Sequence, residues 1–125
     1  PGSHNNHRNL PWEYFERGIE MLGKDRTYII CSNNLDLCRE QEVFKGNNFY
    51  FNDITTKVEK SHFDLCLISK CSDFITSNST FSWWGAYLSQ NSTKRVIAPT
   101  PWYGPGLQHI STEDLYPDSW EVIEA

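Results

Sequence analysis

Short apolar runs, rich in β-branched and aromatic residues, alternate with amphipathic segments along this chain of 125 residues. The runs are apolar at consecutive positions and not at every second one, which is typical of strands that are covered on both faces. Strands of this kind, separated by helices, predict an α/β domain whose sheet is mostly parallel. The chain is long enough for one such domain with a hydrophobic core and too short for two.

The apolar runs predict strands at residues 27–31, 49–51, 73–76 and 94–99, and a last strand at 120–123. Apolar residues predict helices at residues 12–22, 61–70 and 79–90. The cap residues at 32–34 predict a further short helix that runs through residue 40. This order is typical of a Rossmann-like, three-layer domain with a mostly parallel sheet of four to five strands. We assign that domain to residues 11–125. Residues 1–10 are interpreted as a flexible start that opens with a cloning remnant, Pro1-Gly2-Ser3.

The net charge of the chain is −5, and its lysine and arginine residues are scattered. Proteins that bind nucleic acids present a basic stripe, so this distribution argues against a nucleic-acid partner. A single nucleotide can still be bound, because the start of a helix holds a diphosphate without a large positive charge. The four cysteines match no zinc-binding spacing, and we expect buried free thiols at Cys31, Cys38, Cys66 and Cys71.

Polar turns follow three of the predicted strands, at residues 32–34, 52–53 and 77–80. The carboxyl ends of parallel strands meet at one edge of a sheet, and α/β sheets bind their ligands at that edge. The Pro/Gly-rich loop from Thr100 to Gly106 follows another strand, and its Trp102 and Tyr103 could line a sugar or only pack. The sequence therefore predicts a ligand site at this edge.

The turn Ser77-Asn78-Ser79-Thr80 joins a predicted strand directly to a predicted helix. The first backbone N–H groups of a helix have no partner within it and carry the positive end of its dipole. The hydroxyls of Ser79, Thr80 and Ser82 add donors without formal charge, so this turn suits a phosphate or a diphosphate. The alternative is plain capping, since Ser, Thr and Asn precede many helices that bind nothing.

The helix after this turn has apolar residues at a spacing of three and four. We expect one face, formed by Phe81, Trp84, Gly85 and Leu88, to pack on the sheet. Gly85 would allow a close approach, so the start of the helix would be fixed above the strand ends.

Residues 64–88, with the sequence DLCLISKCSDFITSNSTFSWWGAYL, closely resemble the C-terminal motif of the α-1,2-fucosyltransferases. Segments 12–15, 29–32, 96–99 and 115–120 match other parts of the family in the same order and spacing. Trp102 also falls where the family has a tryptophan. The resemblance covers roughly residues 11 to 123, and its central run is long and specific.

The resemblance implies a GDP-fucose-dependent enzyme that transfers fucose to a galactoside hydroxyl with inversion and needs no metal cofactor. The domain would be the C-terminal half of a GT-B-like glycosyltransferase. On this reading Asn78, Ser79 and Thr80, with Ser82 behind them, hold the diphosphate of GDP. Asp64 matches an acidic position near the guanine in related fucosyltransferases. Its alternative role is that of an acidic residue in the first turn of a helix.

Two departures from the family pattern affect the site. The turn Ser32-Asn33-Asn34 is often Ser-Asp-Asp in the family, which leaves the base or ribose contact of Ser32 and Asn33 open. The family also has an upstream His-x-Arg-Arg-x-Asp motif, and the pair His7-Arg8 is not followed by its remaining residues. We therefore expect the catalytic residues in an N-terminal half of the same enzyme, and we interpret His62 and His109 as surface histidines.

The expected partners are GDP-fucose, a galactoside-containing glycan acceptor and that N-terminal half. The alternative is a non-catalytic module that binds a nucleotide or docks a partner, while a purely structural flavodoxin-like domain would leave the motif unexplained. The sequence does not decide the cellular compartment. A bacterial enzyme of this kind would be in the cytoplasm or at the membrane periphery, and a eukaryotic one would be in the Golgi lumen.

Overall fold

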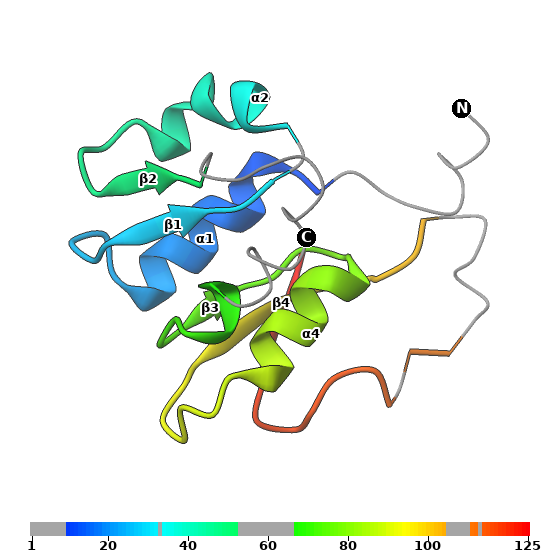
Figure 1. Cartoon of the computed structure of the whole chain (residues 1–125). Helices are drawn as coiled ribbons and strands as arrows, with labels where there is room; N and C mark the ends of the chain where they lie inside the picture. Colours follow the sequence, from blue (N-terminus) through cyan, green and yellow to red (C-terminus); the bar gives the residue numbers. More distant parts are fainter. Residues whose placement is uncertain (1–9, 33, 53–66, 105–110, 113) are drawn as a thin grey trace, which may run out of the picture.

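The computed structural model describes residues 10–32, 34–52, 67–104, 111–112 and 114–125 (Figure 1). Its helical elements are α1 (Trp12–Leu22), α2 (Leu35–Arg39), the 3-10 turn η2 (Glu42–Phe44) and α4 (Thr80–Leu88). Its strands are β1 (Tyr28–Ile30), β2 (Phe49–Phe51), β3 (Phe74–Ile75), β4 (Val96–Thr100) and β5 (Glu121–Glu124). Residues 67–69 are helical as well, and they lie within the helix predicted for residues 61–70. The alternation of strands and helices is therefore confirmed.

The strands are parallel, as predicted, but they form two ladders. β1 pairs with β2, with Ile29 opposite Tyr50. β4 lies between β3 and β5, with Ile75 opposite Ile97 and Ala98 opposite Val122. Within the described residues no backbone ladder joins β1 to β3. The single sheet of four to five strands that the sequence predicted is therefore not observed, and the five described strands form two small sheets. β3 has only two residues, and the backbone hydrogen bonds around it are made with β4 and the residue before it.

Helix α1 connects the two ladders. Gly18 faces β3 so closely that a Cβ atom there would lie 2.9 Å from a side-chain carbon of Ile75. Tyr14, which is 1% exposed, reaches further, and its hydroxyl lies 2.5 Å from the carbonyl oxygen of Thr76 and 3.1 Å from that of Ile97. Ile19 on the same helix packs in a cluster with Tyr28 and other side chains of β1 and β2. One helix thus contacts residues of both ladders.

Adjacent residues of β3 point to opposite faces, which gives the domain its layers. Phe74 packs with Ala86 of α4 and with Val96 and Ala98 of β4. Ile75 packs with the cluster around Ile19. A strand alternates its side chains between the two faces of a sheet. The order of layers is therefore α1, strands and α4, which agrees with the Rossmann-like prediction and is visible in Figure 1.

The predicted packing face of α4 is wrong at Trp84 and Leu88, whereas Gly85 is buried as predicted. Trp84 is 49% exposed and Leu88 is exposed as well, whereas Trp83 packs against the core and Ala86 is fully buried. α4 has no charged residue and is apolar on all sides, so residue spacing could not distinguish the two tryptophans. Trp83 is the tryptophan that packs inward because of a contact with the C-terminal segment: its indole N–H donates to the carbonyl of Leu115 at 2.8 Å.

Gly85 does allow a close approach, but the partner differs from the one predicted. A Cβ atom at Gly85 would lie 2.4 Å from a methyl carbon of Ile68, in the helical residues 67–69, and not against the sheet. The close contact therefore holds α4 against the neighbouring helical segment.

Charged side chains gather at the amino ends of the strands. The guanidinium of Arg95 donates to both carboxylate oxygens of Glu121, at 2.9 and 2.7 Å. Asp73 accepts from the backbone N–H of Arg95 at 2.7 Å and pairs with Arg26. Burial alone would raise the pKa of Asp73, but these two partners outweigh it and hold the pKa below its usual range.

Cys38 is buried, as predicted, whereas Cys31 and Cys71 are only half-buried, and none of these three forms a disulfide. Cys66 lies outside the described residues. No described helix is both long and apolar enough to cross a membrane.

Candidate functional site

The turn of residues 77–80 leads from the carboxyl end of β3 into the first residue of α4. In Figure 1 the strands run in the same sense, so their carboxyl ends and the start of α4 lie on the same side of the molecule. The turn is half-buried except for Thr80, which is exposed. This is the place at which an α/β domain binds its ligands.

Ser79 is the N-cap of α4. Its backbone is extended, with φ −128° and ψ 140°, and its hydroxyl oxygen accepts from the backbone N–H of Ser82 at 3.2 Å. The hydroxyl proton of Ser79 is not used by this bond. The N–H groups of Thr80 and Phe81 belong to the first turn of the helix, where they have no carbonyl of the helix to bind. Several neutral donors therefore lie together at the positive end of the helix dipole, an arrangement suited to an anion.

The hydroxyl of Ser82 is directed back into the turn. It lies 3.1 Å from the carbonyl oxygen of Ser77 and 3.0 Å from that of Ser79, and 3.2 Å from the hydroxyl of Ser77. A hydroxyl has one proton to donate, and here the acceptors are the carbonyls of the turn itself. Ser82 thus stabilises the shape of the turn, because its hydroxyl is directed to these carbonyls. Its predicted part in holding the diphosphate stays a prediction.

The side chain of Asn78 connects the turn to the loop after β4. Its amide nitrogen donates to the carbonyl oxygen of Trp102 at 3.3 Å. Trp102 is 8% exposed, and its ring packs edge-on against Tyr116 with centroids 6.0 Å apart. The ring of Trp102 therefore packs and does not line the site, while Tyr103 beside it is half-buried.

The other predicted contacts are only partly described. The hydroxyl of Ser32 accepts from the backbone N–H of Asn34 at 3.0 Å, and Asn34 caps α2 by accepting from Leu37 at 3.2 Å. Ser32 thus shapes the start of α2 after β1. Asn33 and Asp64 lie outside the described residues, as do the histidines His62 and His109.

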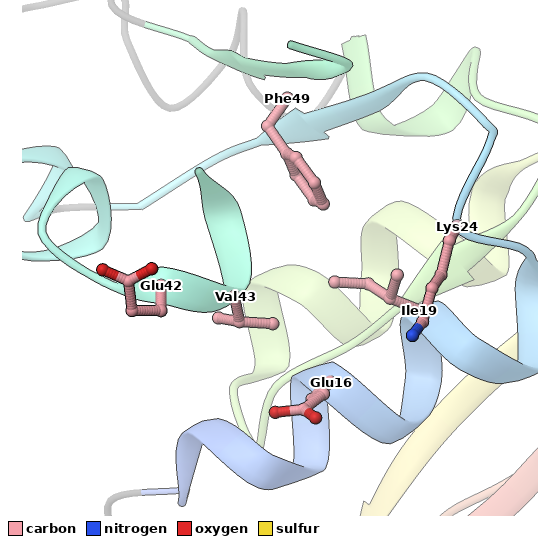
Figure 2. A pocket seen from close by; sticks show the side chains of 6 residues that line it. All are labelled: Glu16, Ile19, Lys24, Glu42, Val43 and Phe49. Atoms are coloured by element: carbon pink, nitrogen blue, oxygen red, sulfur yellow. The ribbon is translucent and has the colours of Figure 1, made fainter. Parts of the chain in front are cut away.

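A hollow of about 360 Å³ lies elsewhere, between α1, η2 and the start of β2 (Figure 2). Its lining consists of Glu16, Ile19, Lys24, Glu42, Val43 and Phe49. Phe49 opens β2 and Lys24 precedes β1, so the hollow lies toward the amino ends of these strands, away from the turn. Two carboxylates against one lysine make it a poor place for a diphosphate.

Among the residues that the structure describes, no group of three or more His, Cys, Asp or Glu side chains is arranged to hold a metal ion. The candidate site in this part of the chain thus consists of neutral hydrogen-bond donors.

Two supporting contacts were missed by the sequence analysis. Tyr14 reaches the carbonyl of Thr76, directly before the turn, and Asn78 reaches Trp102, 24 residues further along the chain. Tyr14 gave a weak signal, because it lies four residues before the small Gly18 on a helix otherwise expected to pack through Trp12, Phe15, Ile19 and Leu22. The bond of Asn78 gave no signal, since it depends on where a loop returns.

Residues 8–124 match the profile described as glycosyl transferase family 11. The chain is 31% identical over 117 residues to the O-antigen biosynthesis glycosyltransferase WbnK of Escherichia coli, a match that covers 91% of this chain and 37% of that protein. It is 30% identical over 99 residues to an alpha-1,2-colitosyltransferase of Escherichia coli, covering 78% of this chain and 32% of that relative. The chain thus spans about a third of the length of these curated relatives. No solved structure matches it significantly.

Proposed function

Because the chain belongs to glycosyl transferase family 11, we propose that it is the part of a fucosyltransferase that binds the donor, GDP-fucose. The resemblance seen in the sequence is confirmed at the level of the family. In this proposal the whole enzyme transfers L-fucose to a hydroxyl of a galactoside with inversion. The domain is the C-terminal half of a GT-B-like enzyme, and an N-terminal half completes the cleft.

The observation that carries the proposal is the turn at the start of α4. The hydroxyls of Ser79 and Thr80 and the N–H groups of Thr80 and Phe81 are neutral donors grouped at a helix N-terminus. When the bond between fucose and GDP breaks, negative charge develops on the diphosphate. Fixed donors at that position stabilise the charge without having to reorganise. Ser82 keeps the turn in shape from behind.

The remaining donor contacts in the proposal come from Asp64, Ser32 and Asn33. Asp64 accepts hydrogen bonds from the guanine, since a carboxylate can pair with both N1–H and the exocyclic amine. Ser32 and Asn33, after β1, contact the base or the ribose. The acceptor, the catalytic base and the arginine that meets the β-phosphate belong to the N-terminal half, and no metal is required.

The test is a panel of nucleotides added to the 125-residue chain. GDP should raise the melting temperature more than UDP, CMP or ADP at equal concentration. At a hundred times its dissociation constant a ligand adds about 2.7 kcal/mol to the free energy of unfolding. Equal shifts for all four nucleotides, or a preference for UDP, would contradict the proposal.

A pair of substitutions separates phosphate binding from capping. Ser79→Gly keeps most of the N-cap stability, since glycine at this position costs only a few tenths of a kcal/mol. Thr80→Ala removes an exposed hydroxyl. Together they should weaken GDP binding by about 1.5–3 kcal/mol for each lost contact to a charged oxygen. The matched control is Thr27→Ala with Ser92→Ala, which alters exposed hydroxyls before β1 and after α4 and should leave GDP binding unchanged.

A further inference from the structure

The bond between Asn78 and Trp102 joins two segments at the carboxyl edge of the strands. Asn78 lies between Ser77 and the N-cap Ser79, in the middle of the turn proposed to hold the diphosphate. Its amide nitrogen donates to the backbone carbonyl of Trp102 at 3.3 Å, across 24 residues of sequence. The acceptor is a backbone atom, so the bond fixes the path of the loop that follows β4 and not merely the rotamer of a side chain.

The same loop is also held by the packing of aromatic rings. Trp102 packs against Tyr116, whose ring lies 5.8 Å from that of Trp120. The hydroxyl of Tyr116 donates to the carbonyl of Pro99 at 2.7 Å, at the end of β4. The side chain of Trp102 is thus anchored by packing, while its backbone carbonyl is bonded to the turn through Asn78.

We propose that Asn78 is a positioning residue that couples the turn of residues 77–80 to the loop Pro101–Gly104, so that this loop forms a second wall of the donor site. The inference rests on the proposed function, because it treats the turn as the diphosphate site. Asn78 then acts on the donor through the loop, and the half-buried Tyr103, which follows Trp102, is the side chain that we expect to form this wall.

The bond itself is tested without any ligand. Asn78→Asp keeps the shape of the side chain but removes the amide donor. The N–H of Tyr103 belongs to the same peptide group as the carbonyl of Trp102, so the NMR amide signal of Tyr103 in the ligand-free chain should shift. Thr80→Ala, in the same turn, is the control and should leave that signal in place. An unmoved Tyr103 signal in Asn78→Asp would overturn the proposal.

The coupling is tested with GDP as the probe. Asn78→Ala should weaken GDP binding by about fivefold to tenfold, the effect of one ordinary hydrogen bond. Tyr103→Ala should weaken it too, and the double variant should lose less than the product of the two effects, because both changes act through one loop. Independent effects, or an affinity that Asn78→Ala does not change, would overturn the positioning role. If the unsubstituted chain binds no nucleotide, the proposed function fails, while the ligand-free comparison still decides whether Asn78 positions the loop.

Discussion

The hydroxyl of Tyr14 lies 2.5 Å from the carbonyl oxygen of Thr76, the last residue before the turn of the candidate site. The same hydroxyl lies 3.1 Å from the carbonyl of Ile97, which also accepts the backbone N–H of Thr76 at 2.9 Å. A side chain from α1 therefore reaches the carboxyl end of β3 and the second residue of β4. The position of the turn depends on α1 as well as on the strands.

Replacing Tyr14 with phenylalanine should lower the free energy of unfolding by about 1–3 kcal/mol, because the buried carbonyl of Thr76 loses its donor. Urea unfolding measures this change. Tyr50→Phe is the matched control, since its ring is exposed, and it should stay within about 0.5 kcal/mol of the unsubstituted chain. A Tyr14→Phe chain as stable as the control would show that the bond contributes nothing.

Stability should decrease at alkaline pH. Burial, with a smaller effect from Tyr116, raises the pKa of Tyr14 well above the usual value near 10, and burial also raises that of Tyr116. The unfolded chain loses these protons above pH ~10 while the folded chain keeps them. The contribution of these two tyrosines to the free energy of unfolding should therefore be constant below that pH and fall above it by up to about 1.4 kcal/mol per pH unit for each tyrosine.

Urea unfolding between pH 8 and pH 11 (chosen to span the ~10 of an ordinary tyrosine) gives this dependence directly. In Tyr14→Phe the decrease above pH ~10 should be shallower, because one proton fewer is held by the folded state. An identical slope in both chains would mean that Tyr14 ionises normally in the fold.

The two adjacent tryptophans of α4 should differ sharply. Trp83→Ala removes a ring that packs on Trp120 and an N–H that donates to Leu115, and it should lower the free energy of unfolding by about 3–5 kcal/mol. Trp84→Ala alters a half-exposed side chain and should cost about 1 kcal/mol or less. Each variant is the control for the other, and the reverse order of stabilities would restore the packing face expected from the sequence.

Lys94 stabilises the end of α4. Its ammonium donates to the carbonyls of Ala86 at 2.8 Å and Ser89 at 2.9 Å, and burial lowers its pKa below the usual value. A cation at a helix C-terminus contributes up to about 2 kcal/mol when it is partly buried. Lys94→Met should therefore lower the melting temperature, whereas Lys45→Met, at an exposed lysine, should not. Equal melting temperatures for the two variants would remove this role.

On the proposed function, the 125-residue chain should bind GDP-fucose without transferring fucose. Holding the acceptor beside the donor can lower the activation barrier by on the order of 7–11 kcal/mol. The proposal assigns this task to the N-terminal half. Incubation with GDP-fucose and β-galactosides, followed by chromatography, should give no product beyond donor hydrolysis. Robust transfer by this chain alone would place the missing groups among its own residues.

The sequence predicted those parts of the fold that depend on local pattern. The strands around Tyr28 and Val96 and the turn at Ser79 follow from continuous apolar runs and from an N-cap residue at a strand-to-helix junction. Their positions differ from the predictions by only a few residues.

The parts that were not predicted depend on contacts between distant segments. The choice of Trp83 over Trp84 is made by the segment around Leu115, and Asn78 meets Trp102 only because the loop after β4 returns to the turn. The separation into two ladders could not be seen either, because the composition of a short strand does not specify its neighbours. Asp64 and Asn33 stay predictions.

Phe74 and Ile75 are neighbours in sequence, yet each belongs to a different hydrophobic cluster. When β3 separates from one cluster, its packing in the other cluster is disturbed as well. The free energy needed to open either ladder locally therefore includes the loss of contacts in both clusters. The two sheets should therefore behave as one cooperative unit in which slow amide exchange extends from β1 to β4. The turn that begins two residues after Ile75 is attached directly to this unit, which suits a site that must keep its donors in place before any ligand arrives.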